Sequence, residues 1–364
     1  MPEMIRFDPN LPLERARTIP SAWYFAPDIA ADERDRVFAN DWQCVGLAED
    51  VAKPGDYLTA DIAGEPVLVV RGADCELRAF FNVCRHRAAV VMPEPCGSAT
   101  KLRCRYHGWT YDLEGKLKGV PEFAGVCDFD KEKEGLMPLG AVEIWGPFVF
   151  IHVKPPREPF AVGAAPLADW ATRCSPFAGM VHHVRREYRV MCNWKVYVDN
   201  YLDGGYHVNT VHPNLAGVLS YADYTTALFA QSSLQSAPLK PAEGDAGRTR
   251  VGERASYWWL WPNFMLNHTD GVMDSNLVLP VTEGECRVVF HFFFRETADH
   301  EFRSASLRTA DEVQEEDRII CEDVQRGLRS RSYDTGRYSV EREAGAHHFH
   351  KLLARTIQSG TSSR

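Results

Sequence analysis

The most constraining feature of this chain is a pair of short segments, Cys84-Arg-His86 and Cys104-Arg-Tyr-His107, which each carry one cysteine and one histidine. Two thiolates and two imidazoles in this paired order are the ligands of a [2Fe–2S] centre in which cysteine holds one iron and histidine the other. Structural zinc is the main alternative, but such sites usually place both cysteines in one pair and both histidines in the other. The order therefore favours iron and sulfide.

The residues around both pairs resemble the two ligand loops of Rieske-type oxygenases. In residues 104–109 a tyrosine precedes the second histidine and Gly-Trp follows it, as in that family, and residues 81–87 resemble the first loop. Arg105 stands where the family usually has proline, which could alter the rigidity of the loop without touching a ligand. Cys96 has no histidine at the right offset, so we interpret it as a loop cysteine.

Composition and charge exclude several classes of protein. The chain has 364 residues, of which 45% are hydrophobic, so it is long enough for two or three domains and is not generally disordered. A net charge of -9 argues against a nucleic-acid partner, because phosphate binding needs clustered Lys and Arg. The sequence shows no signal peptide, transit peptide or membrane-spanning run, and its ten cysteines then indicate a reducing compartment. We expect a cytoplasmic protein without a membrane partner.

Local patterns divide the chain into three regions. Residues 1–40 end in a helical segment, residues 41–155 hold short β-prone runs around the cysteine–histidine pairs, and residues 160–364 follow a proline-rich linker. In the last region we predict strands at 184–191, 255–265, 272–281 and 286–295, and helices at 309–328 and 341–357. The predicted fold class is α+β: a small all-β [2Fe–2S] domain, and a catalytic domain whose antiparallel sheet wraps on helices in the helix-grip manner.

A second motif places His207 and His212 five residues apart. This spacing is one residue longer than the pair that shares a regular helix face, so the helix must widen or unwind between the two imidazoles. Gly204, Gly205 and Pro213 make such an interruption plausible. Two histidines at a helix end are more often surface or capping residues. The segment nevertheless resembles the mononuclear iron motif of the Rieske oxygenases, which implies that both histidines hold Fe(II).

An oxygenase iron site of this type needs one carboxylate beside its two histidines. On the helix predicted near the C-terminus, one face carries Val313, Asp317, Ile320, Val324 and Leu328. Asp317 thus lies within an apolar stripe, where an acid is costly unless it is paired or metal-bound, whereas Glu315 and Glu322 fall on the opposite side. The family resemblance also implies Asp317 as the third ligand. Glu316, at the edge of the stripe, is the next candidate.

The same resemblance implies a homotrimer in which the cluster of one subunit faces the mononuclear iron of its neighbour. In the family, an acid links the two histidine-bound metals and lies three residues before the first iron histidine. That position is Gly204 in this chain. Asp203, one residue earlier, is the first candidate for the linking role, and Asp199 is the second.

Resemblance covers nearly the whole chain and is strongest to choline monooxygenase-like members of the family. Tyr257, Trp259 and Trp261 alternate and would face one side of a strand, with Trp258 on the other. Aromatic faces attract quaternary ammonium groups by roughly 0.5–2 kcal/mol each, so these three could line a substrate site. Aromatic alternation on a strand is also ordinary core packing.

The leading hypothesis is therefore the oxygenase (alpha) subunit of a Rieske non-heme iron monooxygenase. By resemblance, electrons from a separate reductase or ferredoxin pass through [2Fe–2S] to Fe(II), which uses O2 to hydroxylate choline to betaine aldehyde hydrate. No Gly-x-Gly-x-x-Gly fingerprint follows a predicted strand, which favours a separate flavin- and nicotinamide-binding partner. The alternatives are N-demethylation or oxidation of a betaine or carnitine-type compound, aromatic ring hydroxylation, a Rieske electron carrier fused to a ligand-binding module, and a zinc-stabilised binding protein.

Overall fold

The computed structural model describes residues 7–358, which form two compact units. One unit joins the N-terminal residues up to Val37 with the chain from Ala161 onward, and the other is Phe38–Phe160. The N-terminal residues belong to the first unit because Glu33 forms a buried ion pair with Lys195, at 2.5 Å between Oε1 and Nζ. The segment that the sequence sets apart as 1–40 is thus mostly joined to the catalytic region.

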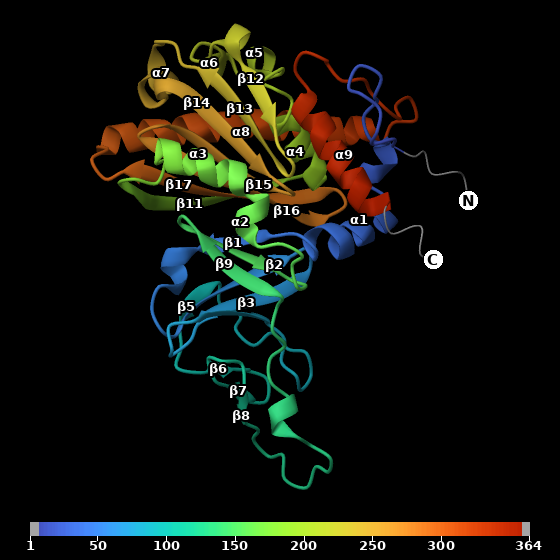
Figure 1. Ribbon diagram of the computed structural model, residues 1–364, viewed down its shortest axis with the longest axis vertical. Coiled ribbons are helices and arrows are strands. Elements are labelled where there is room, and N and C mark those ends of the chain that lie inside the picture. The colour runs from blue at the N-terminus through green and yellow to red at the C-terminus, as the bar shows by residue number, and fades with distance from the viewer. Residues whose placement is uncertain (1–6, 359–364) are drawn as a thin grey trace. The chain divides into compact units, whose positions relative to one another are not determined.

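Phe38–Phe160 is an all-β unit, as predicted (Figure 1). Its sheets have the strand orders β4-β3-β2-β5, β1-β10-β9 and β6-β7-β8. The strands are β1 (Gln43–Leu47), β2 (Asp56–Ile62), β3 (Glu65–Arg71), β4 (Leu77–Phe81), β5 (Cys96–Ser98), β6 (Leu102–Arg103), β7 (Thr110–Tyr111), β8 (Leu117–Gly119), β9 (Ala141–Trp145) and β10 (Phe148–His152).

The core of this unit lies directly beneath the two cysteine–histidine loops. Leu68 and Val70 of β3 pack with Trp109 and Tyr111, and Cys84 and Cys104 belong to the same buried cluster. Strand β3 supplies this packing because all of its residues from Val67 to Val70 are buried. Packing in this core therefore fixes the position of both loops.

The other unit is built on one antiparallel sheet with the strand order β11-β17-β16-β15-β14-β13-β12. These strands are β11 (Met180–Val190), β12 (Thr225–Leu228), β13 (Ser232–Pro238), β14 (Val251–Leu260), β15 (Phe264–Asp270), β16 (Val272–Thr282) and β17 (Glu285–Arg295). The strand predicted at 255–265 is wrong, because the chain turns at Trp261–Pro262 and divides it between β14 and β15. Proline has no N–H for the ladder, so it ends strand pairing at this point.

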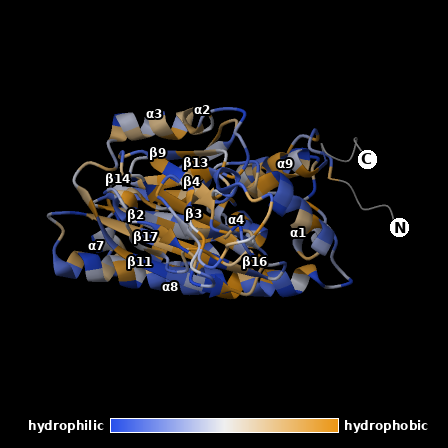
Figure 2. Ribbon diagram, turned by 90° about the horizontal axis from the view of Figure 1, so that it is seen from below, coloured by the Kyte–Doolittle hydropathy of each residue, from blue (hydrophilic) through white to orange (hydrophobic). Residues whose placement is uncertain are grey.

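Helices cover both faces of this sheet, and α3 and α8 lie on opposite sides of it (Figures 1 and 2). The architecture confirms the predicted α+β class with an antiparallel sheet packed on helices. The α-helices are α1 (Pro27–Glu33), α2 (Phe160–Gly163), α3 (Ala165–Cys174), α4 (Trp194–Tyr201), α5 (Val208–Val211), α6 (Pro213–Ala216), α7 (Gly244–Thr249), α8 (His300–Leu328) and α9 (Ala344–Gln358).

Helix α8 is longer than the predicted segment 309–328, because it begins after Asp299, whose side chain caps it by accepting from Phe302 N. Its buried side differs from the predicted stripe. Val324 is 44% exposed, whereas the polar Gln314 and Gln325 are buried. These amides contact α4, where Gln325 accepts from Asn193 N and Gln314 from the Tyr197 hydroxyl. The predicted apolar stripe is therefore wrong at Val324, because α8 buries a hydrogen-bonded polar interface there instead of a purely apolar face.

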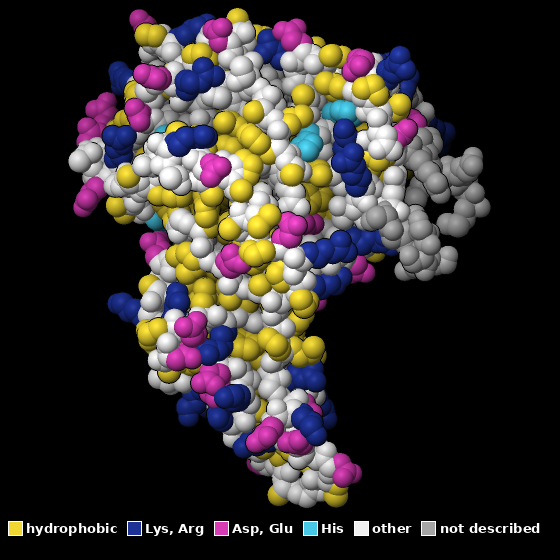
Figure 3. Space-filling model, viewed as in Figure 1, with side chains coloured by type: hydrophobic (Ala, Val, Ile, Leu, Met, Phe, Trp, Pro, Cys, Tyr) yellow, Lys and Arg dark blue, Asp and Glu magenta, His cyan; other side chains and the backbone are white. Residues whose placement is uncertain are grey.

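Charges of both signs are interspersed over the face of the molecule shown in Figure 3.

Among the helices formed by residues 7–358, none is both long enough and apolar enough to cross a bilayer.

Candidate functional site

The two cysteine–histidine loops are built on the same turn. Cys84 N donates to Ala89 O and Ala88 N donates back to Cys84 O, and Cys104 makes the equivalent bonds with Trp109 and Gly108, all between 2.8 and 3.0 Å. Residue five of each turn has positive φ, 56° at Ala88 and 74° at Gly108. The chain thereby reverses tightly enough to bring each histidine back beside its cysteine.

The side chains of these loops divide into a buried and an accessible pair. Cys84 and Cys104 are 3% and 2% exposed, whereas His107 is exposed and His86 is half-buried. The two imidazole centroids lie 4.6 Å apart, and His86 stacks on Trp109. Beneath them, the Tyr111 hydroxyl lies 3.4 Å from Cys84 Sγ and accepts from Arg85 N.

This donor set fits a [2Fe–2S] cluster. Two thiolates and two imidazoles face one another from paired loops, and His86 Nδ1 is buried with no hydrogen-bond partner among the described residues. An imidazole nitrogen left in that state costs free energy unless a ligand such as a metal accepts its lone pair. Cys96, by contrast, is an exposed free cysteine on β5 and does not belong to the buried cluster that holds Cys84 and Cys104.

In the other unit, the chain from α4 to α6 shapes a second cluster. After α4 ends at Tyr201, Gly204 and Gly205 take φ values of 70° and 71°, and the turn lets Asp203 accept hydrogen bonds from Tyr206 N and His207 N. His207 then precedes α5. The helix is interrupted again at His212, which lies between α5 and α6, as the five-residue spacing requires.

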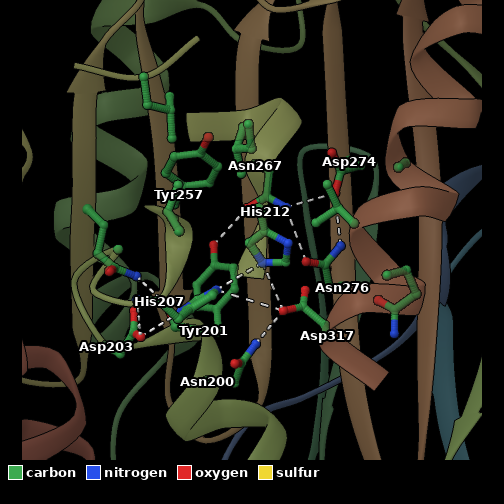
Figure 4. Close-up of a pocket in the computed structure, with 18 of the residues that line it drawn as sticks. Asn200, Tyr201, Asp203, His207, His212, Tyr257, Asn267, Asp274, Asn276 and Asp317 are labelled. Atoms are coloured by element: carbon green, nitrogen blue, oxygen red, sulfur yellow. Dashed lines mark hydrogen bonds and ion pairs between the residues drawn. The ribbon is translucent and has the colours of Figure 1, made fainter. Parts of the chain in front are cut away.

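Helix α8 brings a carboxylate to these two histidines (Figure 4). His207 Nε2 and His212 Nε2 are 3.0 Å apart, and Asp317 Oδ1 lies 3.1 Å from His212 Nε2 and 3.8 Å from His207 Nε2. All three ligand atoms fall within 4.8 Å of one another. This grouping of two imidazoles and one carboxylate could hold a divalent metal ion with coordination positions left open.

Three further polar side chains orient this triad. His207 Nδ1 contacts Asp203 Oδ2 at 2.5 Å, His212 Nδ1 contacts Glu316 Oε2 at 2.7 Å, and Asn200 Nδ2 donates to Asp317 Oδ1 at 2.6 Å. A carboxylate beside each Nδ1 favours the tautomer that carries its proton on Nδ1. The lone pair of each Nε2 therefore points into the triad, where it can bind a metal ion. The triad of His207, His212 and Asp317 therefore fits an iron ion, just as the two cysteine–histidine loops fit a [2Fe–2S] cluster.

The electrostatics of His212 follow from these neighbours. Burial lowers its pKa, but the carboxylates of Asp317 and Glu316 raise it by more, so that the net shift is upward. A cation in the triad would replace that proton and satisfy the same carboxylates.

The remaining acid considered from the sequence, Asp199, lies elsewhere. It accepts from the Tyr24 hydroxyl at 2.5 Å and pairs with His350 Nε2 at 2.8 Å. It therefore belongs to a separate polar cluster with Tyr24 and His350, and of the two acids considered for the linking role only Asp203 contacts an imidazole of the triad. Sequence reasoning missed the role of Asn200, and it considered Glu316 only as a substitute ligand.

A cavity of about 130 Å³ opens beside the triad. Several aromatic side chains line it, and the acid Asp274 lies in its wall, where it accepts from the amides of Asn267 and Asn276 at 2.9 and 2.8 Å. The aromatic lining residues are Tyr197, Tyr201, Tyr224, Tyr257 and Phe290. A cavity of roughly this volume accommodates a ligand about the size of benzene, so the geometry suits a small substrate.

Only part of the predicted aromatic set reaches this cavity. Tyr257 lines it, but Trp259 and Trp261 do not. Trp259 is fully buried, and both tryptophans pack against Phe349 of α9, with Trp259 Nε1 donating to Pro262 O. The interpretation of these two tryptophans as substrate-binding residues is therefore wrong, because α9 covers their end of the sheet face.

Comparison with known proteins gives consistent matches to both units. Residues 41–130 match the family model of the Rieske [2Fe-2S] domain, and residues 177–359 match that of the ring hydroxylating alpha subunit (catalytic domain). The chloroplastic choline monooxygenase of Arabidopsis thaliana is 38% identical, over 97% of this chain and 86% of the relative. The carnitine monooxygenase oxygenase subunit of Escherichia coli (strain K12) is 32% identical over 95% of each. A solved quaternary ammonium Rieske monooxygenase superimposes with a TM-score of 0.88 at 27% identity, covering 97% of this chain and 99% of the other.

Proposed function

The chain belongs to the family of Rieske-type ring-hydroxylating oxygenase alpha subunits, and from this premise we propose that it hydroxylates a small quaternary ammonium compound. The observation that carries the proposal is the His207–His212–Asp317 triad at the wall of a small cavity lined by tyrosines and an acid. Relatives named for choline and carnitine oxidation, at 38% and 32% identity, support the same substrate class.

We assign the metal ligands as follows. Cys84 and Cys104 would hold one iron of the cluster and His86 and His107 the other, and His207, His212 and Asp317 would hold Fe(II). When bound, the cluster supplies single electrons and the Fe(II) ion supplies the activation of dioxygen.

The protein's own residues orient this chemistry. Asp203 and Glu316 keep the Nδ1 protons on His207 and His212, so both Nε2 atoms stay available. Asp203 is also our candidate for the acid that links the two metal sites between subunits of a homotrimer.

The substrate is held, in this proposal, by charge and by ring faces. Tyr201, Tyr224 and Tyr257 offer aromatic surface to a cationic headgroup. Among the described residues that line the cavity, Asp274 is the one acid that does not contact the triad. Choline is the reference substrate: with O2, two electrons and two protons it would yield betaine aldehyde hydrate and water. N-demethylation of a betaine or carnitine-type compound by the same residues is the second candidate, which Arg250 in the cavity wall favours.

The electrons would come from a separate reductase or ferredoxin. An oxygen-uptake assay with such an electron donor tests the proposed reaction. The holoenzyme with a generic reductase should consume oxygen when choline or a betaine is added, and release the matching aldehyde or formaldehyde. The Asp317→Ala variant, prepared and assayed in the same way, should neither consume oxygen nor release an aldehyde. If wild-type enzyme oxidised aromatic rings and no quaternary ammonium compound, the proposed substrate class would be wrong.

A further inference from the structure

A second, smaller cavity of about 50 Å³ adjoins the one beside the triad. Arg250, Tyr257, Asn267 and Asp274 line both, so these residues form the passage from one to the other. In Figure 4, Tyr257 and Asp274 lie toward the top of the view and Asp203 and Asn200 toward the bottom, with the triad between them. A substrate reaching from the triad past Asp274 would place its far end in the smaller cavity.

The smaller cavity holds hydrogen-bond donors that lack acceptors. Thr269 Oγ1 is buried and has no hydrogen-bond partner among residues 7–358, and the buried Tyr257 hydroxyl has no acceptor there, its neighbour being the guanidinium of Arg250, which can only donate. Buried hydroxyls are nearly always satisfied in folded proteins. Two such groups in the wall of one cavity therefore indicate a ligand that accepts hydrogen bonds.

The smaller cavity also carries a positive charge, which suits a ligand that is an anion. Arg250, between α7 and β14, is the one Lys or Arg among the described residues that line either cavity. Within the described part of the chain its guanidinium forms no ion pair with a carboxylate. Asp274, which lines both cavities with Arg250, instead accepts hydrogen bonds from the amides of Asn267 and Asn276. His268 also lines the cavity, and burial lowers its pKa, so it is neutral and does not compete for an anion.

We propose that Arg250, Tyr257 and Thr269 form a carboxylate-binding subsite, so that the substrate is a zwitterionic N-methylated amino-acid betaine. This inference rests on the proposed function and extends it. The cationic nitrogen lies against Asp274 and the tyrosine rings, while the carboxylate accepts from the guanidinium and both hydroxyls. Choline carries an alcohol at that end and offers the half-buried guanidinium no counter-charge, whereas a carboxylate would pair with it.

The test compares choline with glycine betaine, which differ in the alcohol and the carboxylate but share the trimethylammonium group. Wild-type holoenzyme should show the higher kcat/KM with glycine betaine. Arg250→Gln should lower kcat/KM for the betaine by roughly 10- to 100-fold, because a hydrogen-bonded charge pair is lost, and change that for choline by less than about threefold. Arg248→Gln, an exposed arginine of the neighbouring α7 paired with exposed Glu301, is the matched control and should change neither.

A second variant guards against a folding defect at Arg250. Tyr257→Phe keeps the ring and removes only the hydroxyl, so it should weaken betaine binding by roughly 5- to 10-fold, measured by calorimetry on the holoenzyme, without weakening choline binding. Equal losses for both compounds, or a wild-type preference for choline, would overturn the carboxylate subsite. If no quaternary ammonium compound is turned over but glycine betaine still binds in an Arg250-dependent way, the subsite stands and the proposed reaction fails.

Discussion

The two candidate metal sites differ in how the chain assembles them. In Phe38–Phe160 the four cysteine and histidine donors come from two turns within residues 84–107, and backbone hydrogen bonds shape both turns identically. In the other unit, His207 and His212 come from an interrupted helix and Asp317 from α8, and side-chain carboxylates orient the imidazoles. The first site is thus encoded locally, whereas the second depends on tertiary packing. Single side-chain changes should therefore separate the two sites.

The largest effect is expected at Asp317. Asp317→Ala removes the carboxylate that contacts both Nε2 atoms, so product formation should fall by at least about a hundredfold while dithionite still reduces the cluster. Product assays beside visible spectra of the same sample measure both quantities. Normal turnover would show that Asp317 is not a ligand, and Glu316 would be tested next.

The converse change is His107→Cys. An all-thiolate cluster has a reduction potential lower by roughly 250 mV or more than one with two imidazoles, so the variant should lose the Rieske spectrum and stop delivering electrons. Iron at the His207–His212–Asp317 triad should be retained. Redox titration with a parallel metal assay checks this, and an unchanged potential would remove His107 from the ligand set.

A smaller effect is expected from the carboxylates that orient the imidazoles. Glu316→Gln should weaken Fe(II) binding by roughly 10- to 100-fold, because the amide is a poorer acceptor for the Nδ1 proton of His212. Glu315→Gln is the control, since Glu315 is exposed and paired with Arg318 on the other side of α8. Comparable losses in both variants would mean that general charge, rather than the hydrogen bond to His212, governs metal affinity.

The contrast between the sites also explains what the sequence could predict. The two cysteine–histidine loops, the α+β class and the interruption between His207 and His212 depend on spacing over a few residues. The apolar stripe that indicates Asp317 also places exposed Val324 on the buried side, and the hydrogen bonds of buried Gln314 and Gln325 explain the difference. Local spacing was thus a good guide to short-range geometry and a poorer one to burial.

Other features depended on parts of the chain that no local pattern connects. Glu316 contacts His212 from 104 residues away, so its role could not be read from spacing. Trp259 and Trp261 share the alternation of Tyr257, but α9 covers only their end of the strand. Asp203 reaches His207 from four residues before it because Gly204 and Gly205 turn the backbone, a signal that the glycine pair did offer.

The smallest expected effect concerns acid stability. Burial lowers the pKa of His291 to about 3, below the ordinary value of 6.5. Between these two pH values the unfolded state binds a proton that the folded state does not bind. Stability from this group is therefore complete above pH 6.5 and declines as the pH falls from 6.5 toward 3. His291→Phe should flatten the fall of the unfolding midpoint over that range, as thermal melts at stepped pH would show. An unchanged slope would mean that other groups dominate.

The central claim, that one chain carries a histidine-ligated cluster and a separate iron site, is tested most directly by the iron and acid-labile sulfide content of purified protein. Wild type should contain about three irons and about two sulfides per chain, and Asp317→Ala about two of each. Zinc without sulfide in the wild type, or the same iron content in both proteins, would contradict the account.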